Sequence, residues 1–249
     1  MPKPAYKGIS DVKIIHLLPN LVTISAICAG LTAIRFGYQG EFETAVQLIL
    51  VACILDGLDG RLARLLKCPS LLGAELDSLA DFLNFGVAPV LIIYSWGFAE
   101  GRSIGWIAVL AYTVCCVLRL ARFNVDNQPD DAKSNDRFIG VPSPAGAILV
   151  MLPMFVSFLF SDFPLAPPTW IAGYMFAIGF LMISRVPTYA FKNITIDRAN
   201  AKFLLLGAVL LTAALLTYLW ATLVVLTLAY IASVAWALRS SFILPTTKD

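Results

Sequence analysis

The chain has 249 residues, of which 59% are hydrophobic and 14% are charged, with a formal net charge of +2. A soluble domain carries about 25% charged residues, so this chain has too few to cover a surface exposed to water. Together with the mean hydropathy of +0.81, this excludes an ordinary soluble domain and indicates a polytopic membrane protein.

Apolar segments of roughly the 20 residues that cross a bilayer recur along the whole chain. The first is expected to be a retained span rather than a signal peptide, because no small-residue cleavage site and soluble domain follow it. The pattern predicts eight spans, near residues 15–37, 43–66, 72–98, 104–122, 142–161, 167–185, 203–219 and 221–238.

The predicted fold class is therefore an all-α membrane protein, a polytopic bundle of eight transmembrane helices. We expect a core over residues 1–190 with six spans, followed by two additional helices and a short tail over residues 191–249. The last two spans carry almost no polar residue beyond Thr and Tyr. They are expected to be a structural addition rather than part of a site.

The positive charges are distributed unevenly between the two sides of this bundle. Sixteen of the 18 Lys and Arg residues fall in segments that eight spans place on one side, and only Arg35 and Arg102 fall on the other. Cytoplasmic segments carry the excess of Lys and Arg, so both termini are predicted in the cytoplasm. The protein is expected in the inner (cytoplasmic) membrane, with the polar segment 124–138 as a solvated cytoplasmic connection.

The cysteines do not predict a disulfide framework or a zinc site. Their number is odd, they form no CxxC pair and most lie in apolar runs, as expected for small buried side chains. They are Cys28, Cys53, Cys68, Cys115 and Cys116.

Four aspartates interrupt the apolar sequence between residues 56 and 81. Asp56 and Asp59 are spaced i, i+3, and Asp77 and Asp81 are spaced i, i+4. On helices, each pair presents two carboxylates on one face. Charges within a span are costly and mark functional sites. Four hard oxygen ligands favour Mg²⁺ or Mn²⁺ over zinc.

The predicted topology places these acids at one depth near the cytoplasmic face. Arg119, Arg122, Ser143 and Arg185 reach the same level, and the outer half of the bundle is nearly free of charge. Metal-bound carboxylates beside arginines suggest phosphate chemistry, with one carboxylate taking a proton from the nucleophile. A divalent-cation transporter is the alternative from another class, but a transport path needs polar groups that reach both faces.

Small residues follow the first two acids. Gly57, Gly60 and Ala63 would let a substrate approach the helix closely. Tight packing between helices alone is the alternative.

These residues form a recognisable pattern. It resembles the signature of the CDP-alcohol phosphatidyltransferase family at every fixed position, as Asp56-x2-Asp59-Gly60-x2-Ala63-Arg64-x8-Gly73-x3-Asp77-x3-Asp81. The resemblance implies a core of six transmembrane helices, a homodimer and two divalent cations, Mg²⁺ or Mn²⁺. It also implies transfer of a phosphatidyl group from a CDP-linked lipid to an alcohol, with release of CMP.

The resemblance implies roles for individual residues. Asp56, Asp59 and Asp77 correspond to metal ligands, and Asp81 to a ligand of the second metal that also acts as general base. The positions that correspond to contacts with CDP-diacylglycerol are Pro19, Asn20, Thr23, Gly60, Arg64 and Ser70. For Asn20 and Thr23, helix capping or local hydrogen bonding is an alternative. His16 is expected to be an interfacial side chain.

Two later segments bear on the acceptor alcohol. They resemble segments of the bacterial membrane-integral phosphatidylserine synthases within this family, and they are Arg119-Leu-Ala-Arg122-Phe-Asn124 and Phe138-Ile-Gly-Val-Pro142-Ser143-Pro144-Ala-Gly. The acceptor implied is L-serine, whose carboxylate suits a bidentate arginine, Arg119 or Arg122. Asn124 and Ser143 would contribute to the same site.

Two questions about the acceptor stay open. The arginines would otherwise bind the phosphates of the CDP-lipid or only mark the end of the fourth span. The same chemistry with glycerol phosphate, inositol phosphate or choline as acceptor is the alternative function. No nucleic-acid partner is expected.

Overall fold

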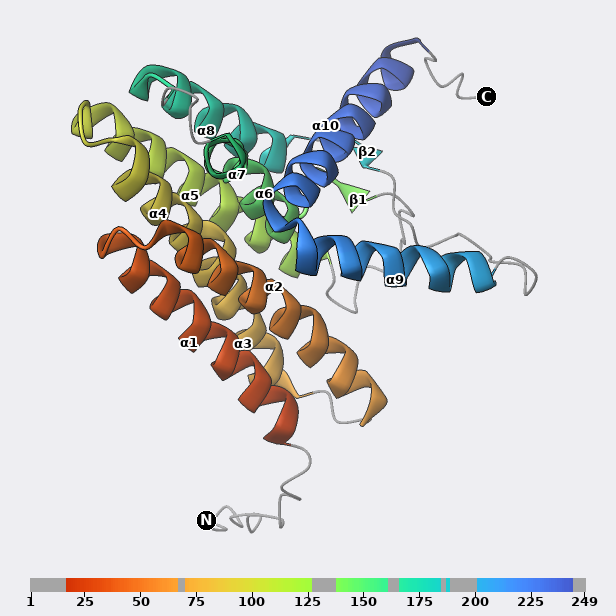
Figure 1. The fold of residues 1–249 in the computed structure, drawn as a ribbon. Coiled ribbons are helices and arrows are strands. Elements are labelled where there is room, and N and C mark those ends of the chain that lie inside the picture. The colour runs from red at the N-terminus through yellow and green to blue at the C-terminus, as the bar shows by residue number, and fades with distance from the viewer. Residues whose placement is uncertain are drawn as a thin grey trace, which may run out of the picture.

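The protein is described from a computed structural model, which places residues 17–66, 70–126, 138–160, 166–184, 187–188 and 201–243. Within these ranges the chain is almost entirely helical (Figure 1). His16, Cys68 and Arg185 lie outside the described residues, as does the polar connection 127–137.

The first two helices form an antiparallel pair. Helix α1 (Leu18–Tyr38) begins with Pro19 near its N-terminus, where a missing N–H costs nothing, and α2 (Phe42–Leu65) returns beside it. Gly40 makes the turn between them at φ 84°, in the left-handed region that favours glycine. Small buried residues on α1, including Ala26 and Ala33, allow the close approach of its neighbours.

The third predicted span is not one regular helix. It consists of α3 (Leu71–Asp81), a π-helical segment η2 (Phe82–Val87) and α4 (Ala88–Gly97). A π-helix changes the hydrogen-bonding pattern of the backbone, and side chains of α5 (Arg102–Asp126) bond two of its carbonyls. The Tyr112 hydroxyl donates to Phe85 O at 3.2 Å, and the Thr113 hydroxyl donates to Gly86 O at 3.1 Å.

The fifth predicted span is also interrupted. Helices α6 (Ser143–Val150) and α7 (Leu152–Leu159) meet at Met151. Pro153 has no N–H to continue the helical ladder, and its ring disfavours the preceding turn. Helix α8 (Pro168–Ile183) follows and packs along α5. One short antiparallel ladder, β1 (Phe138–Ile139) with β2 (Pro187–Thr188), was not predicted.

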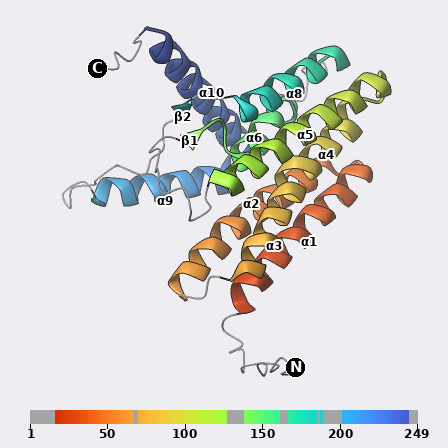
Figure 2. The same cartoon turned by 180° about the vertical axis from the view of Figure 1, so that it is seen from behind.

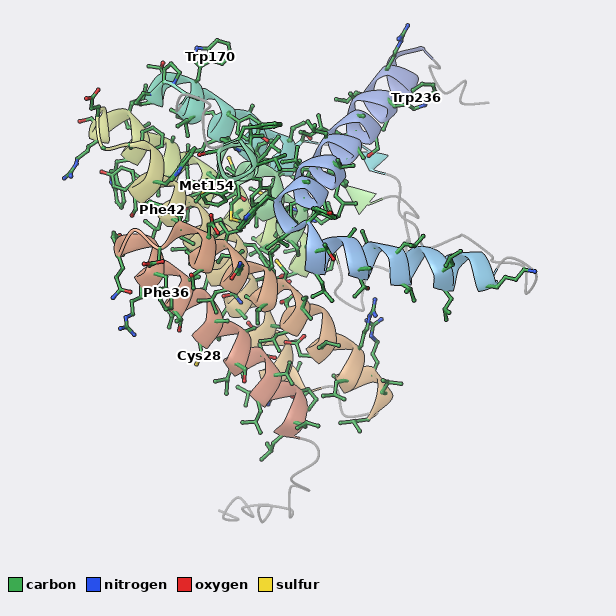
Figure 3. All side chains as sticks on the ribbon, viewed as in Figure 1. Cys28, Phe36, Phe42, Met154, Trp170 and Trp236 are labelled. Atoms are coloured by element: carbon green, nitrogen blue, oxygen red, sulfur yellow. The ribbon has the colours of Figure 1, made fainter. Side chains whose placement is uncertain are left out.

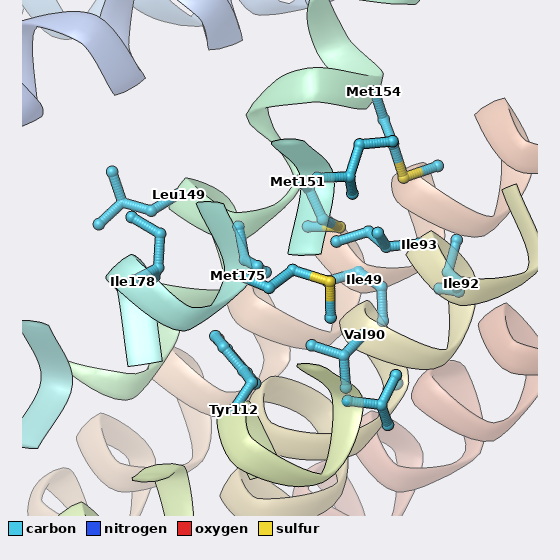
Figure 4. Close-up of a cluster of buried hydrophobic side chains, with 14 of the residues drawn as sticks. Ile49, Val90, Ile92, Ile93, Tyr112, Leu149, Met151, Met154, Met175 and Ile178 are labelled. Carbon is cyan, nitrogen blue, oxygen red and sulfur yellow. The ribbon is translucent and has the colours of Figure 1, made fainter. Parts of the chain in front are cut away.

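A dry core joins α2, α4, α5 and the α6–α8 segment. Figure 4 shows Met151, Met154 and Met175 gathered beside Ile49 and Ile93, and all five side chains are almost completely buried. Flexible methionine side chains fill the irregular space that the break between α6 and α7 creates.

The two C-terminal helices extend from this bundle. Helix α9 (Ala201–Thr217) projects away from the bundle in both views, with Leu215 near its C-terminal end packed on the core, and α10 (Leu219–Ile243) packs against α7 (Figures 1 and 2). The Trp220 ring lies 6.4 Å from the Phe155 ring and 4.7 Å from the Phe158 ring, measured between centroids. These contacts fix the position of α10 on the bundle.

The outer surface is apolar. Trp170 and Trp236 point away from the bundle (Figure 3) and are 75% and 72% exposed. Large exposed apolar surfaces of this kind are compatible with lipid rather than water. In the part of the chain that the structure describes, four helical segments are long and apolar enough to cross a membrane, namely Leu18–Tyr38, Leu71–Gly97, Arg102–Val125 and Leu219–Arg239.

The chain is therefore a multi-pass membrane protein. Each of the eight ranges predicted from the sequence coincides with helix. The number of crossings and the orientation of the termini stay predictions.

Candidate active site

Helices α2 and α3 bring three carboxylates together. One oxygen from each of Asp56, Asp59 and Asp77 lies within 4.8 Å of the other two. Asp59 is only 3% exposed, and the buried Oδ1 of Asp56 has no hydrogen-bond partner in the described part of the chain. Repulsion between the carboxylates and an unpaired buried oxygen are both costly without a cation. This donor set fits a hard divalent cation.

Asp81 lies one turn beyond Asp77, at the end of α3. It is not part of the group of three, but its side chain lies within hydrogen-bonding range of Asp56. It also interacts electrostatically with Arg119. Two carboxyl groups this close need a shared proton or cation. Asp81 is therefore placed to receive a proton or to share a second ion.

Helix α1 supports the cluster of three carboxylates. The Thr23 hydroxyl lies 2.6 Å from Asp59 Oδ2 and 3.1 Å from the Pro19 carbonyl oxygen, so its single proton serves one of them at a time. The Gly60 N–H donates to the other oxygen, Asp59 Oδ1. Donors of this kind fix the orientation of a ligating carboxylate. The local hydrogen bonding considered for Thr23 is present, and it also reaches Asp59 of the carboxylate cluster.

A second group of predicted residues meets at the N-terminus of α3. Ser70 caps this helix, because its Oγ accepts from the Gly73 N–H at 3.0 Å. A methyl group at Gly73 would lie 3.0 Å from Asn20 Oδ1, so Asn20 of α1 lies against the same turn. The exposed Arg64 donates through Nε to Gly60 O at 3.0 Å. Its side chain therefore lies back along α2 toward the aspartates.

Two glycines leave the surface of α2 open beside the carboxylates. A Cβ added at Gly57 or Gly60 would meet nothing within 4 Å among the described atoms. At Gly30, by contrast, it would lie 2.0 Å from Asn84 Oδ1. Tight packing between helices thus explains Gly30 but does not explain Gly57 and Gly60, which favours the approach of a substrate.

A buried arginine of α5, Arg119, forms hydrogen bonds with the segment that follows β1. Arg119 is 9% exposed; its Nε donates to Val141 O, and its NH1 group donates to Ser143 Oγ at 3.1 Å. Gly140 has φ 86°, and a methyl group there would lie 2.6 Å from Met182 O. Glycine is therefore needed to bring this segment close to α8 while Val141 and Ser143 reach Arg119.

The other two residues predicted to bind the acceptor, Asn124 and Arg122, have different partners. Asn124 donates to Ser78 Oγ at 3.1 Å, which ties the end of α5 to the residue after Asp77. The exposed Arg122 donates instead to Ile183 O at 3.1 Å, at the C-terminal end of α8. Among the described residues it makes no hydrogen bond to the aspartates or to Ser143. Its contact is that of a basic side chain at a helix C-terminus.

Asn84 was missed in the sequence. It lies in η2, three residues after Asp81, and is fully buried, with both polar side-chain atoms unpaired among the residues described. A lone amide in the apolar run that follows Asp81 was the available signal, since polar residues within spans are costly and functional.

Carboxylates clustered on α2 and α3 of a multi-pass membrane protein, together with the buried Arg119, form a site that could bind a divalent cation. Residues 16–191 match the family described as CDP-alcohol phosphatidyltransferase. The chain belongs to this family, and it is a transferase of phospholipid biosynthesis. Family membership decides for phosphatidyl transfer over cation transport.

Three relatives extend the match. A CDP-diacylglycerol–serine O-phosphatidyltransferase of Mycobacterium leprae (strain TN) is 36% identical over 228 residues, which are 91% of this chain and 76% of the relative. The protein of that name from Helicobacter pylori (strain J99) is 37% identical over 199 residues, 80% of this chain and 81% of its own. The protein of that name from Bacillus subtilis (strain 168) is 35% identical over 179 residues, which are 72% of this chain and 93% of the relative.

Proposed function

We propose that this enzyme transfers the phosphatidyl group of CDP-diacylglycerol to the hydroxyl of L-serine. A bond forms between the serine oxygen and the lipid-side phosphorus, and the bond from that phosphorus to the bridging oxygen breaks. CMP leaves with the electron pair of the broken bond, and the serine proton passes to Asp81. The products are phosphatidylserine and CMP.

The observation that carries this proposal is the gathering of the four aspartates of α2 and α3 beside the buried Arg119. The aspartates supply the cation site and the base, and the arginine supplies a partner for an anionic acceptor. The names of the three relatives support serine as that acceptor.

Asp56, Asp59 and Asp77 would hold the first divalent cation, and Asp81 would share the second. Two such ions, Mg²⁺ or Mn²⁺, would supply positive charge to neutralise phosphate oxygens and the developing charge on the leaving group. Thr23 and the Gly60 N–H keep Asp59 oriented toward this site. The chain's own contribution is a fixed set of oxygens that needs little rearrangement when substrate binds.

Asp81 is assigned as the general base. It lies outside the group of three carboxylates but interacts with Asp56, so it is adjacent to the proposed metal site. A base must be within hydrogen-bonding reach of the hydroxyl that it deprotonates. Arg119 limits the accumulation of negative charge around Asp81.

The CDP-lipid is assigned to the open face of α2 and the N-terminus of α3. Gly60 lets the nucleotide approach the helix, and Arg64 supplies positive charge beside it. Asn20 and Ser70 lie together at the adjoining turn. Pro19 and Thr23 would act mainly by holding α1 and Asp59 in place.

Serine is assigned to the side of Asp81 that faces α5 and α6. Arg119 would pair with its carboxylate, and Ser143 holds the guanidinium in position. Asn124 is a further contact near Ser78. Arg122 stays a weaker candidate, because its hydrogen bond holds the end of α8.

The proposed setting is the inner membrane, with eight spans, both termini and the active site on the cytoplasmic side, and residues 1–190 as the catalytic core. Labelling of single cysteines in intact cells tests the orientation. A cysteine at Gln39, in the α1–α2 turn, should react from outside, and one at Ser70 should not. The homodimer implied by the family resemblance is tested by the mass of the protein in detergent, after correction for bound detergent.

The purified enzyme with CDP-diacylglycerol and Mg²⁺ or Mn²⁺ should convert labelled serine to phosphatidylserine and release CMP in equal amount. Glycerol phosphate, inositol phosphate and choline, tested one at a time, should give no lipid product. Turnover with one of these and none with serine would overturn the proposal.

A further inference from the structure

Helix α10 brings an unpartnered hydroxyl to the bundle. The Tyr230 side chain packs against the buried core, and its hydroxyl oxygen is inaccessible to solvent and has no hydrogen-bond partner within the described ranges. A buried hydroxyl without a partner costs about 1–3 kcal/mol, so it is expected where a ligand completes its bonding. Tyr230 lies beyond residues 16–191, which match the family.

The charged neighbour of Tyr230 is Arg119. Each side chain lies within electrostatic range of the other, and Arg119 in turn interacts with Asp81. Arg119 therefore interacts electrostatically both with the aspartate assigned as base and with the tyrosine of α10. This places a residue of the C-terminal extension beside the proposed acceptor site.

Arg119 has unused donors there. A guanidinium has five N–H groups. Arg119 donates one to Val141 O and one to Ser143 Oγ. Its three remaining N–H groups bond no acceptor among the residues that the structure places. Guanidinium donors without an acceptor, within electrostatic range of an unpartnered buried hydroxyl, form a donor set for an anion with planar oxygens, such as a carboxylate.

We propose that Tyr230 is a specificity-determining residue. Its hydroxyl donates a hydrogen bond to the carboxylate of the acceptor amino acid, which Arg119 also binds. The inference rests on the proposed function, because it takes an amino acid as the acceptor. It gives α10 a role in the site that the sequence did not predict.

The test is the Tyr230→Phe variant of the full chain, which removes one oxygen and keeps the ring that packs on the core. A hydrogen bond to a charged group is worth about 1.5–3 kcal/mol, so the KM for serine should rise about tenfold or more. The kcat and the KM for CDP-diacylglycerol should stay within about twofold of wild type, as expected when only an acceptor contact is lost.

An acceptor without the carboxylate separates this contact from a structural effect. Serinol carries a hydroxymethyl group in its place, so Tyr230→Phe should lower the ratio of kcat/KM for serine to that for serinol about tenfold. This ratio does not depend on the fraction of folded enzyme. Tyr218→Phe is the matched control, because Tyr218 precedes α10 and is 70% exposed, and it should leave the ratio unchanged.

Three results would overturn the inference. They are an unchanged ratio in Tyr230→Phe, a higher KM for CDP-diacylglycerol alone, and a lower kcat with both KM values unchanged. The second would assign the hydroxyl to a lipid phosphate. Failure of the proposed function would appear separately, as wild-type enzyme that does not turn over serine.

Discussion

Replacement of Thr23 by valine tests whether α1 supports the metal site. Valine has nearly the same shape as threonine but lacks the hydroxyl, so the change removes the 2.6 Å hydrogen bond to Asp59 Oδ2. Both residues are 3% exposed, so solvent cannot replace the lost donor easily. Asp59 would keep only the Gly60 N–H on its other oxygen.

The magnitude follows from the charge and burial of the acceptor. A hydrogen bond to a charged group is worth about 1.5–3 kcal/mol, which corresponds to roughly 10- to 150-fold in an equilibrium constant. Loss of a partner that orients a metal ligand typically costs about 10- to 100-fold in metal affinity. We therefore expect Thr23→Val to weaken Mn²⁺ binding by about 10- to 100-fold.

The assay is direct Mn²⁺ binding by electron paramagnetic resonance, beside the metal dependence of CMP release. Thr23→Ser retains the hydroxyl and should bind Mn²⁺ nearly as well as wild type. Thr32→Val is the matched control, because the Thr32 hydroxyl lies on the same helix and donates to the backbone oxygen of Cys28. Unchanged Mn²⁺ affinity in Thr23→Val, with a raised KM for CDP-diacylglycerol, would refute the reasoning and assign Thr23 to the nucleotide.

Four further predictions concern single residues. Asp81→Asn removes the proposed base without changing the side-chain shape, so turnover should fall at least about 10²-fold. CDP-diacylglycerol and the first Mn²⁺ ion, assigned to the other three aspartates, should still bind. Retained turnover would contradict the assignment. Gly60→Ala should leave the melting temperature unchanged or raised, since its Cβ meets nothing within 4 Å, but should raise the KM for CDP-diacylglycerol. Gly30→Ala forces its Cβ against Asn84 Oδ1 and should destabilise the protein by about 1–3 kcal/mol, seen as a lower melting temperature in detergent. Arg122→Ala should affect the KM values of both substrates equally through the end of α8, and a selective rise for serine would return Arg122 to the acceptor site.

The sequence alone predicted the class of molecule and the reaction centre. Apolar runs predict membrane helices reliably, because a backbone in lipid must satisfy its own hydrogen bonds. The spacing of Asp56 with Asp59, and of Asp77 with Asp81, places each pair on one helix face whatever the rest of the fold does. The family resemblance, which rests on these local spacings, was confirmed over residues 16–191.

Only the tertiary structure decided which side chains support that centre. The bond from Thr23 to Asp59 joins residues 36 positions apart, and the tie from Arg119 to Ser143 spans 24. The π-helical segment after Asp81 and the position of Tyr230 beside Arg119 depend on packing between helices. Local spacing fixes the face on which a side chain lies, whereas its partner is fixed by how the helices pack together.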